Sequence, residues 1–382
     1  MQGKAEHLRI WWLTAFLLLL SFAPARIYWD AWREGVGFAG MPLFAKTRID
    51  STLPEIRALA LPTETQFGYD GQFYAQLAID PTLRRDEFDQ ALDLPAYRSL
   101  RIAMPACAWL LGVGDPLRSI NVYACLNAFA WIGMLVILFR RLAPLNLRRA
   151  AVIAALLLSQ GTLTSISRSL TDLPATTFLL AALLAQGPWG RGAWFFTAVI
   201  TRETALISFP GFLKFRPIHE ALNWRNWLPL VPAIGIFVLW YLYVHTRFPG
   251  HTLSGGENFT LPFTGLFQKI SGAFLAFCSV PSRHHFFELI APLSLTFQGG
   301  YFIVFRRPDC QVWRFAIPWA ALLLCLGPWV WVEQLAFTRV LLPLTVAFNL
   351  SLVLQSHART EWLFCFIAGN IGLGLLAFNI YF

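Results

Sequence analysis

The stretch from Phe67 to Ala78, FGYDGQFYAQLA, sets one carboxylate, Asp70, among aromatic side chains at the start of a short apolar helix. An aspartate in this position has two plausible roles. It can cap the helix that begins at Gly71, because Asp is among the preferred N-cap residues. It can also act as a general base that takes a proton from a substrate hydroxyl. Residue chemistry alone favours the cap, and both roles are compatible in one residue.

A second candidate is the segment Arg168-Ser169-Leu170-Thr171-Asp172-Leu173-Pro174, which lies between two apolar runs. An Asp near a helix start, with Pro just inside it, is a common signal for a helix N-terminus. Yet Arg168 and Asp172 are expected at the same membrane depth as Asp70. The structural and functional interpretations therefore both stay open.

Two further ionisable groups interrupt apolar sequence. Arg202 and Glu203 lie inside the run from Ala193 to Leu213 and, as neighbours on a helix, cannot fully neutralise each other. Ionisable residues within a membrane segment are costly and favour a functional hypothesis, although a buried ion pair with another span is the alternative. Arg339 opens the run Val340 to Leu354. It is either a snorkelling interface anchor or a partner for a lipid phosphate.

The elements that must position these residues are membrane helices. The chain is 57% hydrophobic and 13% charged, whereas soluble domains carry about 25% charged residues. Several runs approach the roughly 20 apolar residues that cross a bilayer core. These runs are Ile10 to Ala25, Ser119 to Phe139, Trp227 to Val244, Phe286 to Phe305, Phe315 to Val332 and Trp362 to Phe382. We therefore expect an all-α, polytopic transmembrane bundle formed by residues 1–382 as one domain.

Positive charge orients this bundle, because Lys and Arg gather on cytoplasmic loops. The net charge of +9 is partly a consequence of this rule, and we expect no nucleic-acid partner. The predicted inside segments carry Lys4 and Arg9, Arg140 to Arg149, Arg191, Lys214 to Arg225, and Arg306 to Arg314. Residues 26–100, 245–285 and 333–339 then fall outside.

This topology predicts roughly nine full crossings and an external C-terminus. Residues Ala150 to Ile166 form one of the crossings. Residues Ala193 to Leu213 have positive charge at both ends, so we expect a half-membrane hairpin whose tip approaches the outer side. The first run could instead be a cleavable signal peptide, since Ala23-Pro24-Ala25 is an acceptable cleavage site.

An external loop, residues 26–118, follows the first span, and residues 119–382 form the rest of the bundle. We expect a short interfacial helix from Gly71 to Ile79, ended by Asp80-Pro81. The stretch Arg101 to Gly114 is too short to span and is expected to be re-entrant or surface-lying. The apolar face of the first helix is expected to comprise Phe67, Tyr69, Phe73, Tyr74, Leu77 and Ile79.

Metal-binding and modification motifs are weak. The six cysteines are scattered without disulfide or zinc spacing, and we interpret them as small buried hydrophobes. His284 and His285 are neighbours in a predicted external loop, and adjacent histidines make a poor tetrahedral site. Asn258-Phe259-Thr260 matches a glycosylation sequon, a short motif with a high false-positive rate. We therefore predict no metal ligands.

Tyr69-Asp70-Gly71-x-x-Tyr74 resembles the first-loop signature of GT-C glycosyltransferases, in particular the aromatic-Asp pair followed by Tyr of a GPI mannosyltransferase family. The run from Phe67 through Asp80-Pro81 to Tyr97-Arg98 and Arg101 is similar to a family of bacterial membrane proteins named for cell-surface glycopolymer formation. Arg168 to Pro174, Thr201-Arg202-Glu203-Thr204 and Arg339 to Pro343 resemble its pattern too. These stretches cover roughly a quarter of the chain.

The resemblance implies a GT-C-like bundle in the bacterial inner membrane, with an active site facing the periplasm or outside. It implies hexosyl or pentosyl transfer from a polyprenyl-phosphate donor to a cell-surface glycan or glycolipid acceptor. Asp70 matches the catalytic base, which here also caps its helix, and Asp172 matches an acid beside the acceptor pocket. Arg202 and Arg339 are expected on the carrier phosphate. The candidate substrate-binding residues are Tyr69, Tyr74, Arg98, Arg101, Arg168, Asp172, Arg202, Glu203 and Arg339.

Three points stay open at the level of sequence. GT-C enzymes often carry paired acids in the first loop, whereas Asp70 is followed by Gly71, so the need for a divalent metal is undecided. A transporter or lipid flippase for glycan precursors would also need charged residues at membrane depth, but such proteins tend to have paired halves. A non-catalytic assembly subunit is the third hypothesis, and it would tolerate loss of Asp70.

Overall fold

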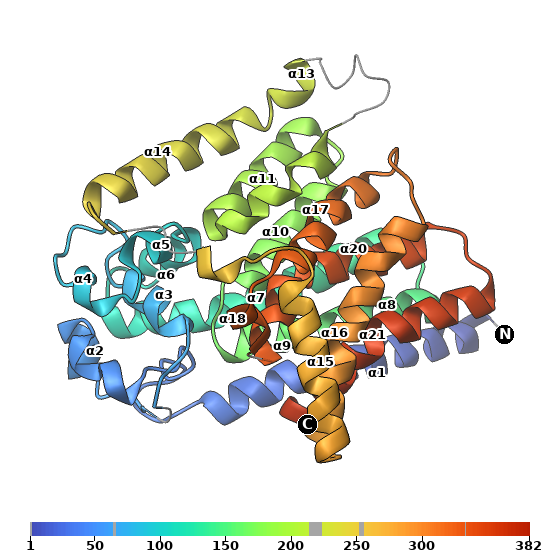
Figure 1. Cartoon of the computed structure of the whole chain (residues 1–382), viewed down its shortest axis with the longest axis horizontal. Helices are drawn as coiled ribbons and strands as arrows, with labels where there is room; N and C mark the ends of the chain where they lie inside the picture. Colours follow the sequence, from blue (N-terminus) through green and yellow to red (C-terminus); the bar gives the residue numbers. More distant parts are fainter. Residues whose placement is uncertain (1, 64–65, 214–223, 252–255, 333) are drawn as a thin grey trace.

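The computed structural model of the chain is helical from end to end (Figure 1). It describes residues 2–63, 66–213, 224–251, 256–332 and 334–382. Within those ranges, extended pairing is limited to two isolated bridges, Arg33 with Gly37 and Phe259 with Leu326. The all-α prediction is therefore confirmed. Lys214 and Arg216, which mark one predicted inside loop, lie outside the described residues.

Among the described residues, four helices are long and apolar enough to cross a membrane, as expected of an integral membrane protein. They are α1 (Gln2–Ala31), α7 (Pro116–Leu142), α16 (Arg283–Val304) and α21 (Arg359–Tyr381). Two further helices, α8 (Leu147–Leu157) and α9 (Gln160–Ser167), meet at a 41° bend and form either a broken fifth span or a re-entrant loop. The Ser159 hydroxyl accepts a hydrogen bond from the Thr162 N–H and so starts a new helix inside the expected span 150–166.

The predicted nine full crossings are wrong for the described residues. The remaining apolar helices are α10 (Asp172–Leu184), α14 (Val231–Arg247), α17 (Gln311–Cys325) and α20 (Leu342–Leu354). At about 1.5 Å per residue they reach roughly 20 to 26 Å, short of a bilayer core of about 30 Å. Short helices α13 (Trp224–Trp227), α18 (Pro328–Val332) and α19 (Gln334–Val340), with the longer α15 (Thr264–Ser279), complete the bundle.

The segment Ala193 to Leu213 does form a hairpin. Helix α11 (Pro188–Thr201) ends at Arg202, whose backbone is extended, and the 3-10 helix η2 (Glu203–Phe212) follows at once. The ring of Phe195 lies 4.9 Å from that of Phe212, so the two arms run side by side. Arg202 and Glu203 are therefore at the tip of a reversal in the chain.

The chain between α1 and α7 folds into a compact unit instead of lying as separate surface helices. Its elements are η1 (Lys46–Ser51), α2 (Pro54–Ala58), α3 (Gly71–Leu77), α4 (Phe88–Ala91), α5 (Pro95–Ser99) and α6 (Ala103–Leu111). These surround their own apolar core, which includes Phe44, Tyr74 and Phe88. All residues of α3 are buried, whereas Phe67 is 77% exposed and does not belong to the predicted apolar face.

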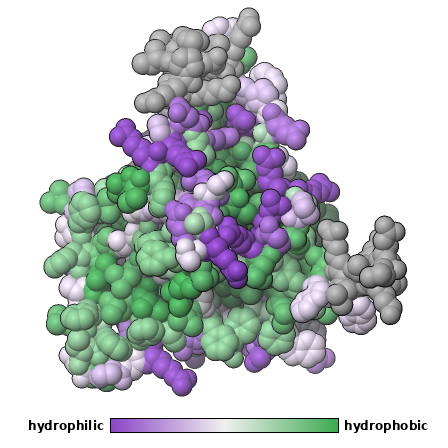
Figure 2. Space-filling view, turned by 90° about the vertical axis from the view of Figure 1, so that its right-hand side faces the viewer, coloured by the Kyte–Doolittle hydropathy of each residue, from purple (hydrophilic) through white to green (hydrophobic). Residues whose placement is uncertain are grey.

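The α2–α6 unit and the connections that carry Arg148 and His357 lie at two different ends of the molecule. Figure 1 places the unit of α2 to α6 at the far end of α1 from the N-terminus. At the other end, Arg148 donates a hydrogen bond to the His357 carbonyl at 3.2 Å, so two polar connections meet there. Figure 2, which views that end, shows hydrophilic side chains gathered in a band, with hydrophobic surface below and to the side.

Two smaller predictions need correction. His284 and His285 are in the first turn of α16, after the Ser282 cap, and not in a loop. Of the six cysteines, Cys365 is buried, while Cys278 is exposed and the others are partly exposed, so burial does not describe them as a group.

Candidate active site at the hairpin tip

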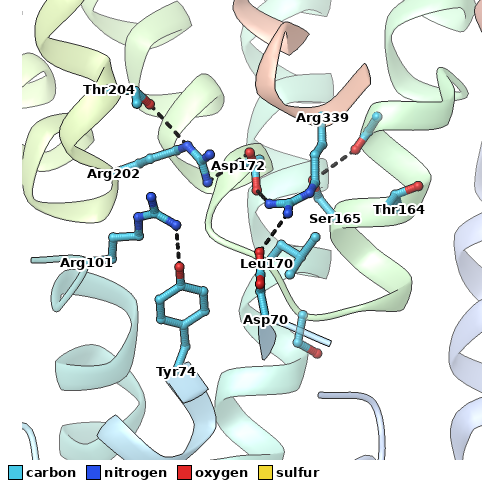
Figure 3. Close-up of polar contacts among 12 residues, drawn as sticks. Asp70, Tyr74, Arg101, Thr164, Ser165, Leu170, Asp172, Arg202, Thr204 and Arg339 are labelled. Atoms are coloured by element: carbon cyan, nitrogen blue, oxygen red, sulfur yellow. Dashed lines mark hydrogen bonds and ion pairs between the residues drawn. The ribbon is translucent and has the colours of Figure 1, made fainter. Parts of the chain in front are cut away.

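One cavity of about 600 Å³ lies where the α2–α6 unit, the hairpin tip and α19 meet. Figure 3 shows polar contacts at this place, among them those of Arg339 with Asp70 and Asp172. Its polar wall contains most of the ionisable residues singled out from the sequence. The apolar part of its lining comes from α17, α18 and α19. Its lining includes Asp70, Tyr97, Arg98, Arg101, Arg202, Glu203, Asn258, Leu322, Leu326, Trp329, Val330, Ala336 and Arg339.

Asp70 lies at the N-cap position of α3 but does not cap it. Its backbone is already helical, and its side chain makes no capping hydrogen bond. The carboxylate instead contacts two arginines, with Oδ1 3.0 Å from Nη2 of Arg98 and Oδ2 2.7 Å from Nη2 of Arg339. The predicted cap is therefore wrong, because charged donors from other segments have taken the carboxylate away from the helix N–H groups.

Arg339 is in the last turn of α19 and does not open the following helix. Its residue surface is 8% exposed, which excludes the snorkelling anchor. While Nη2 contacts Asp70, Nη1 lies 3.1 Å from Oδ2 of Asp172. One guanidinium therefore joins two carboxylates.

Asp172, at the start of α10, is 2% exposed. Its Oδ1 lies 3.0 Å from Nη1 of Arg202, whose Nε donates to the Thr204 hydroxyl at 3.1 Å. Asp172 borders a small neighbouring pocket with Arg202 and Arg339, and it does not line the large cavity. Its observed position is that of a residue that holds two arginines in place.

Glu203 pairs with Arg101, whereas its neighbour Arg202 pairs with Asp172. Arg101 donates to Glu203 with both Nε and Nη2, at 2.7 and 2.6 Å. The same guanidinium contacts the hydroxyls of Tyr74 and Tyr97. Arg101 is 1% exposed, so this bidentate pair is a strong link between the α2–α6 unit and the hairpin tip.

Close backbone packing fixes the relative positions of these elements. A Cβ atom on Gly71 would lie 2.2 Å from the Arg168 carbonyl oxygen, so only glycine lets α3 approach the 168–171 segment this closely. That segment is held from α7, where Tyr123 donates to the Ser169 carbonyl at 2.7 Å and Asn127 to that of Leu170 at 3.0 Å. Asp70 and Asp172 are thereby brought to one side of Arg339.

Gly161 does the same for α19. A Cβ atom at this position in α9 would lie 2.5 Å from the Thr338 carbonyl oxygen and 3.2 Å from Cα of Arg339. The bend between α8 and α9 thus places α9 directly against the helix that carries Arg339.

The charge environment holds Asp70 in its ionised form. Burial by itself opposes ionisation, but Arg98, Arg339 and Arg101 outweigh it and hold the pKa of the Asp70 carboxyl well below its usual range. In the arrangement described here, Asp70 is therefore a weak proton acceptor.

The remaining predicted residues lie at the margin of this network. The ring of Tyr69 lies at cation–π distance from two arginines. Its centroid is 5.4 Å from the Arg339 guanidinium and 6.0 Å from that of Arg168. The part of Arg168 that packs closest to Gly71 is its carbonyl oxygen. Asn258 of the sequon is partly buried and lies on the cavity wall.

Sequence reasoning missed Asp93 and the apolar wall. Asp93 accepts from both Nε and Nη2 of Arg98, at 2.8 and 2.7 Å. An acid five residues before an arginine, next to Pro95, looks like ordinary loop sequence, so no local signal marked it. The apolar run Phe315 to Val332 predicts Trp329 and Val330 within a spanning helix, but a break starts the short helix α18 and both residues line the cavity.

The donor set does not suit a divalent metal. Among the described residues no group of three or more His, Cys, Asp or Glu side chains is positioned to hold one. Ca²⁺ and Mg²⁺ require about six oxygen ligands, and the carboxylates of Asp70 and Glu203 on this cavity each have arginine partners. Four arginines and two carboxylates among the described lining residues favour an anion.

Comparison with known proteins adds no relative to this geometry. No family model, no curated protein and no solved structure matches the chain.

Proposed function

We propose that this protein is an integral membrane glycosyltransferase. It would move a hexosyl or pentosyl group from a polyprenyl-phosphate donor to a cell-surface glycan or glycolipid. The observation that carries the proposal is one cavity with an arginine-rich wall, an apolar wall and a carboxylate, Asp70, beside the arginines.

The two walls suit the two parts of such a donor. Arg98 and Arg339 present guanidinium groups, whose fork matches phosphate oxygens. In the same cavity, Leu322, Trp329 and Val330 offer an apolar surface for an isoprenoid chain. An amphipathic phosphate lipid would contact both the arginines and the apolar residues, whereas a soluble nucleotide sugar would leave the apolar residues exposed to water.

The proposed step is a single displacement at the anomeric carbon. The acceptor hydroxyl oxygen forms the new glycosidic bond while the bond from that carbon to the phosphate oxygen breaks. The hydroxyl proton goes to the Asp70 carboxylate, and the electron pair of the broken bond leaves on the polyprenyl phosphate. Arginines beside the phosphate stabilise the charge that develops there, and one positioned base is sufficient for the proton.

The test is sugar transfer per folded molecule, measured with purified protein, a radiolabelled polyprenyl-phosphate sugar and a glycolipid acceptor. Asp70→Asn removes the proton acceptor and should lower the rate about 10²–10⁴-fold, the usual range for a general base. Asp86→Asn is the matched control in the same unit, because the Asp86 side chain is 98% exposed. Folding of each variant is checked by thermal shift in detergent.

Near-normal turnover by folded Asp70→Asn would remove Asp70 from the mechanism. A wild-type protein that transfers no sugar but moves the labelled donor between leaflets of proteoliposomes would replace the glycosyltransferase with a flippase. A protein with neither activity would be an assembly subunit.

A further inference from the structure

The two arginines that hold Asp70 each have a second carboxylate. Arg98 is gripped by Asp93 through two nitrogens, at 2.8 and 2.7 Å. Arg339 is held by Asp172 at 3.1 Å. Asp70 lies between the two arginines, with one oxygen on each. Removing the Asp70 carboxylate would thus leave both guanidinium groups charged, paired and in position.

These three carboxylates differ in access. Asp70 is among the described residues that line the large cavity, whereas Asp93 and Asp172 are not among them. The Asp172 side chain is 2% exposed and that of Asp70 is 23% exposed. Asp93 is 30% exposed, but it is not among the described residues that line the cavity. An anion that enters the cavity therefore meets the two arginines at the place where Asp70 now binds them.

We infer that the Asp70 carboxylate occupies the phosphate subsite in the empty protein, between Nη2 of Arg98 and Nη2 of Arg339, and that the phosphate of an incoming lipid displaces it. Phosphate oxygens accept the same charge-assisted N–H contacts as a carboxylate, so a phosphate can take the place of Asp70 on Nη2 of each arginine. Asp93 and Asp172 meanwhile keep the two guanidinium groups in position. The subsite is thus assigned to Arg98 and Arg339. Arg202 also lines the cavity, but its Nη1 contacts Asp172 and its Nε donates to Thr204, so we assign it as a positioning residue.

This exchange would also explain how Asp70 becomes a base, a part of the inference that rests on the proposed function. While two arginines bind it, the carboxylate is a poor proton acceptor. Once the phosphate neutralises them, the carboxylate is released beside the same phosphate. Proton transfer is then available only when the donor is in place.

Binding of farnesyl phosphate to detergent-purified protein tests the subsite without any sugar transfer. Asp70→Asn keeps the side-chain shape but removes the negative charge that competes for Nη2 of Arg98 and of Arg339. The affinity of this variant for farnesyl phosphate should therefore rise about tenfold, the factor expected for one charge-assisted contact. Asp86→Asn should bind like wild type. Asp70→Ser is a second neutral variant, should Asp70→Asn fold poorly.

Two further ligands separate the phosphate from the chain. Inorganic phosphate should gain affinity in Asp70→Asn in the same direction, and farnesol should not. Unchanged or weaker binding of farnesyl phosphate by folded Asp70→Asn would overturn the inference, as would an equal gain for farnesol. A gain in binding with no sugar transfer by wild type would keep the subsite and refute the glycosyltransferase.

The release step has its own readout in the wild-type protein. The acid limb of kcat/KM reports the free enzyme, and that of kcat reports the enzyme with donor bound. If the phosphate frees Asp70, the kcat limb should lie at higher pH than the kcat/KM limb. Coincident limbs would overturn the release, because Asp70 would then have the same partners in both states.

Discussion

Arg339 divides one guanidinium between Asp70 and Asp172, with Nη2 2.7 Å from the first carboxylate and Nη1 3.1 Å from the second. The contact joins α3, α10 and α19, which are distant in sequence. A point charge could neutralise one of these acids but could not reach both in this geometry. Arg339 is therefore the residue on which the arrangement of the site depends most.

Stability should depend on pH through Asp70. Burial opposes its ionisation, yet the arginines prevail and hold its folded-state pKa below the unfolded value of about 3.9. Its stabilising contribution is thus fully present above that pH and is lost as the pH falls toward the folded-state pKa.

We expect wild type to unfold at higher temperature than Asp70→Asn by an amount equivalent to about 1–3 kcal/mol, the cost of losing a charged hydrogen-bond partner. This gap should be constant above about pH 5 and should narrow below about pH 4. Thermal unfolding in detergent across this range measures it, with Asp86→Asn as control. A gap that widens on acidification would contradict the low pKa.

Lysine should replace Arg202 better than Arg339. Arg202 uses one nitrogen on Asp172 and another on a neutral hydroxyl, whereas Arg339 contacts two carboxylates. Arg339→Lys should therefore lose at least about tenfold more transfer activity than Arg202→Lys, the value of one charge-assisted contact.

Transfer per folded molecule is the measurement, and Arg118→Lys is the control, since Arg118 is exposed at the start of α7. Equal losses in the two lysine variants would mean that only positive charge matters at these positions.

Alanine at Gly161 should displace Arg339 from its two acids. The added Cβ would lie 2.5 Å from the Thr338 carbonyl, so α19 must move. We expect Gly161→Ala to lower both activity and melting temperature. Gly300→Ala in α16 is the matched control, because its Cβ meets nothing within 4 Å and Ala favours a helix by up to about 1 kcal/mol. A Gly161→Ala protein as active as wild type would show that α19 tolerates the shift.

Chemical labelling should place the α2–α6 unit outside. In a background without the native cysteines, Asp89→Cys should react with a membrane-impermeant maleimide on intact cells. Arg141→Cys and Arg306→Cys, from segments predicted inside by the positive charge bias, should react only after the membrane is opened. Reaction of Asp89→Cys only after opening would invert the topology and place the cavity on the cytoplasmic side.

The sequence by itself determined the helical membrane character, the helix at Gly71, the hairpin around Arg202 and most of the charged residues at the site. These features are local. A charge within an apolar run, or positive charge at both ends of one, is visible in a short window of residues. The lengths of the crossings were less certain, because a serine cap at Ser159 divides a run that composition alone presents as continuous.

Only the tertiary structure decided the partners. Asp70 and Arg339 are 269 positions apart, and their contact depends on the close packing of glycines at 71 and 161. The same packing removed the predicted cap, because two guanidinium groups bind a carboxylate more strongly than helix N–H groups do. Asp93 belongs to the site for a similar reason, because tertiary packing decides its role. Its pairing with Arg98 becomes meaningful only when the fold brings that arginine to Asp70.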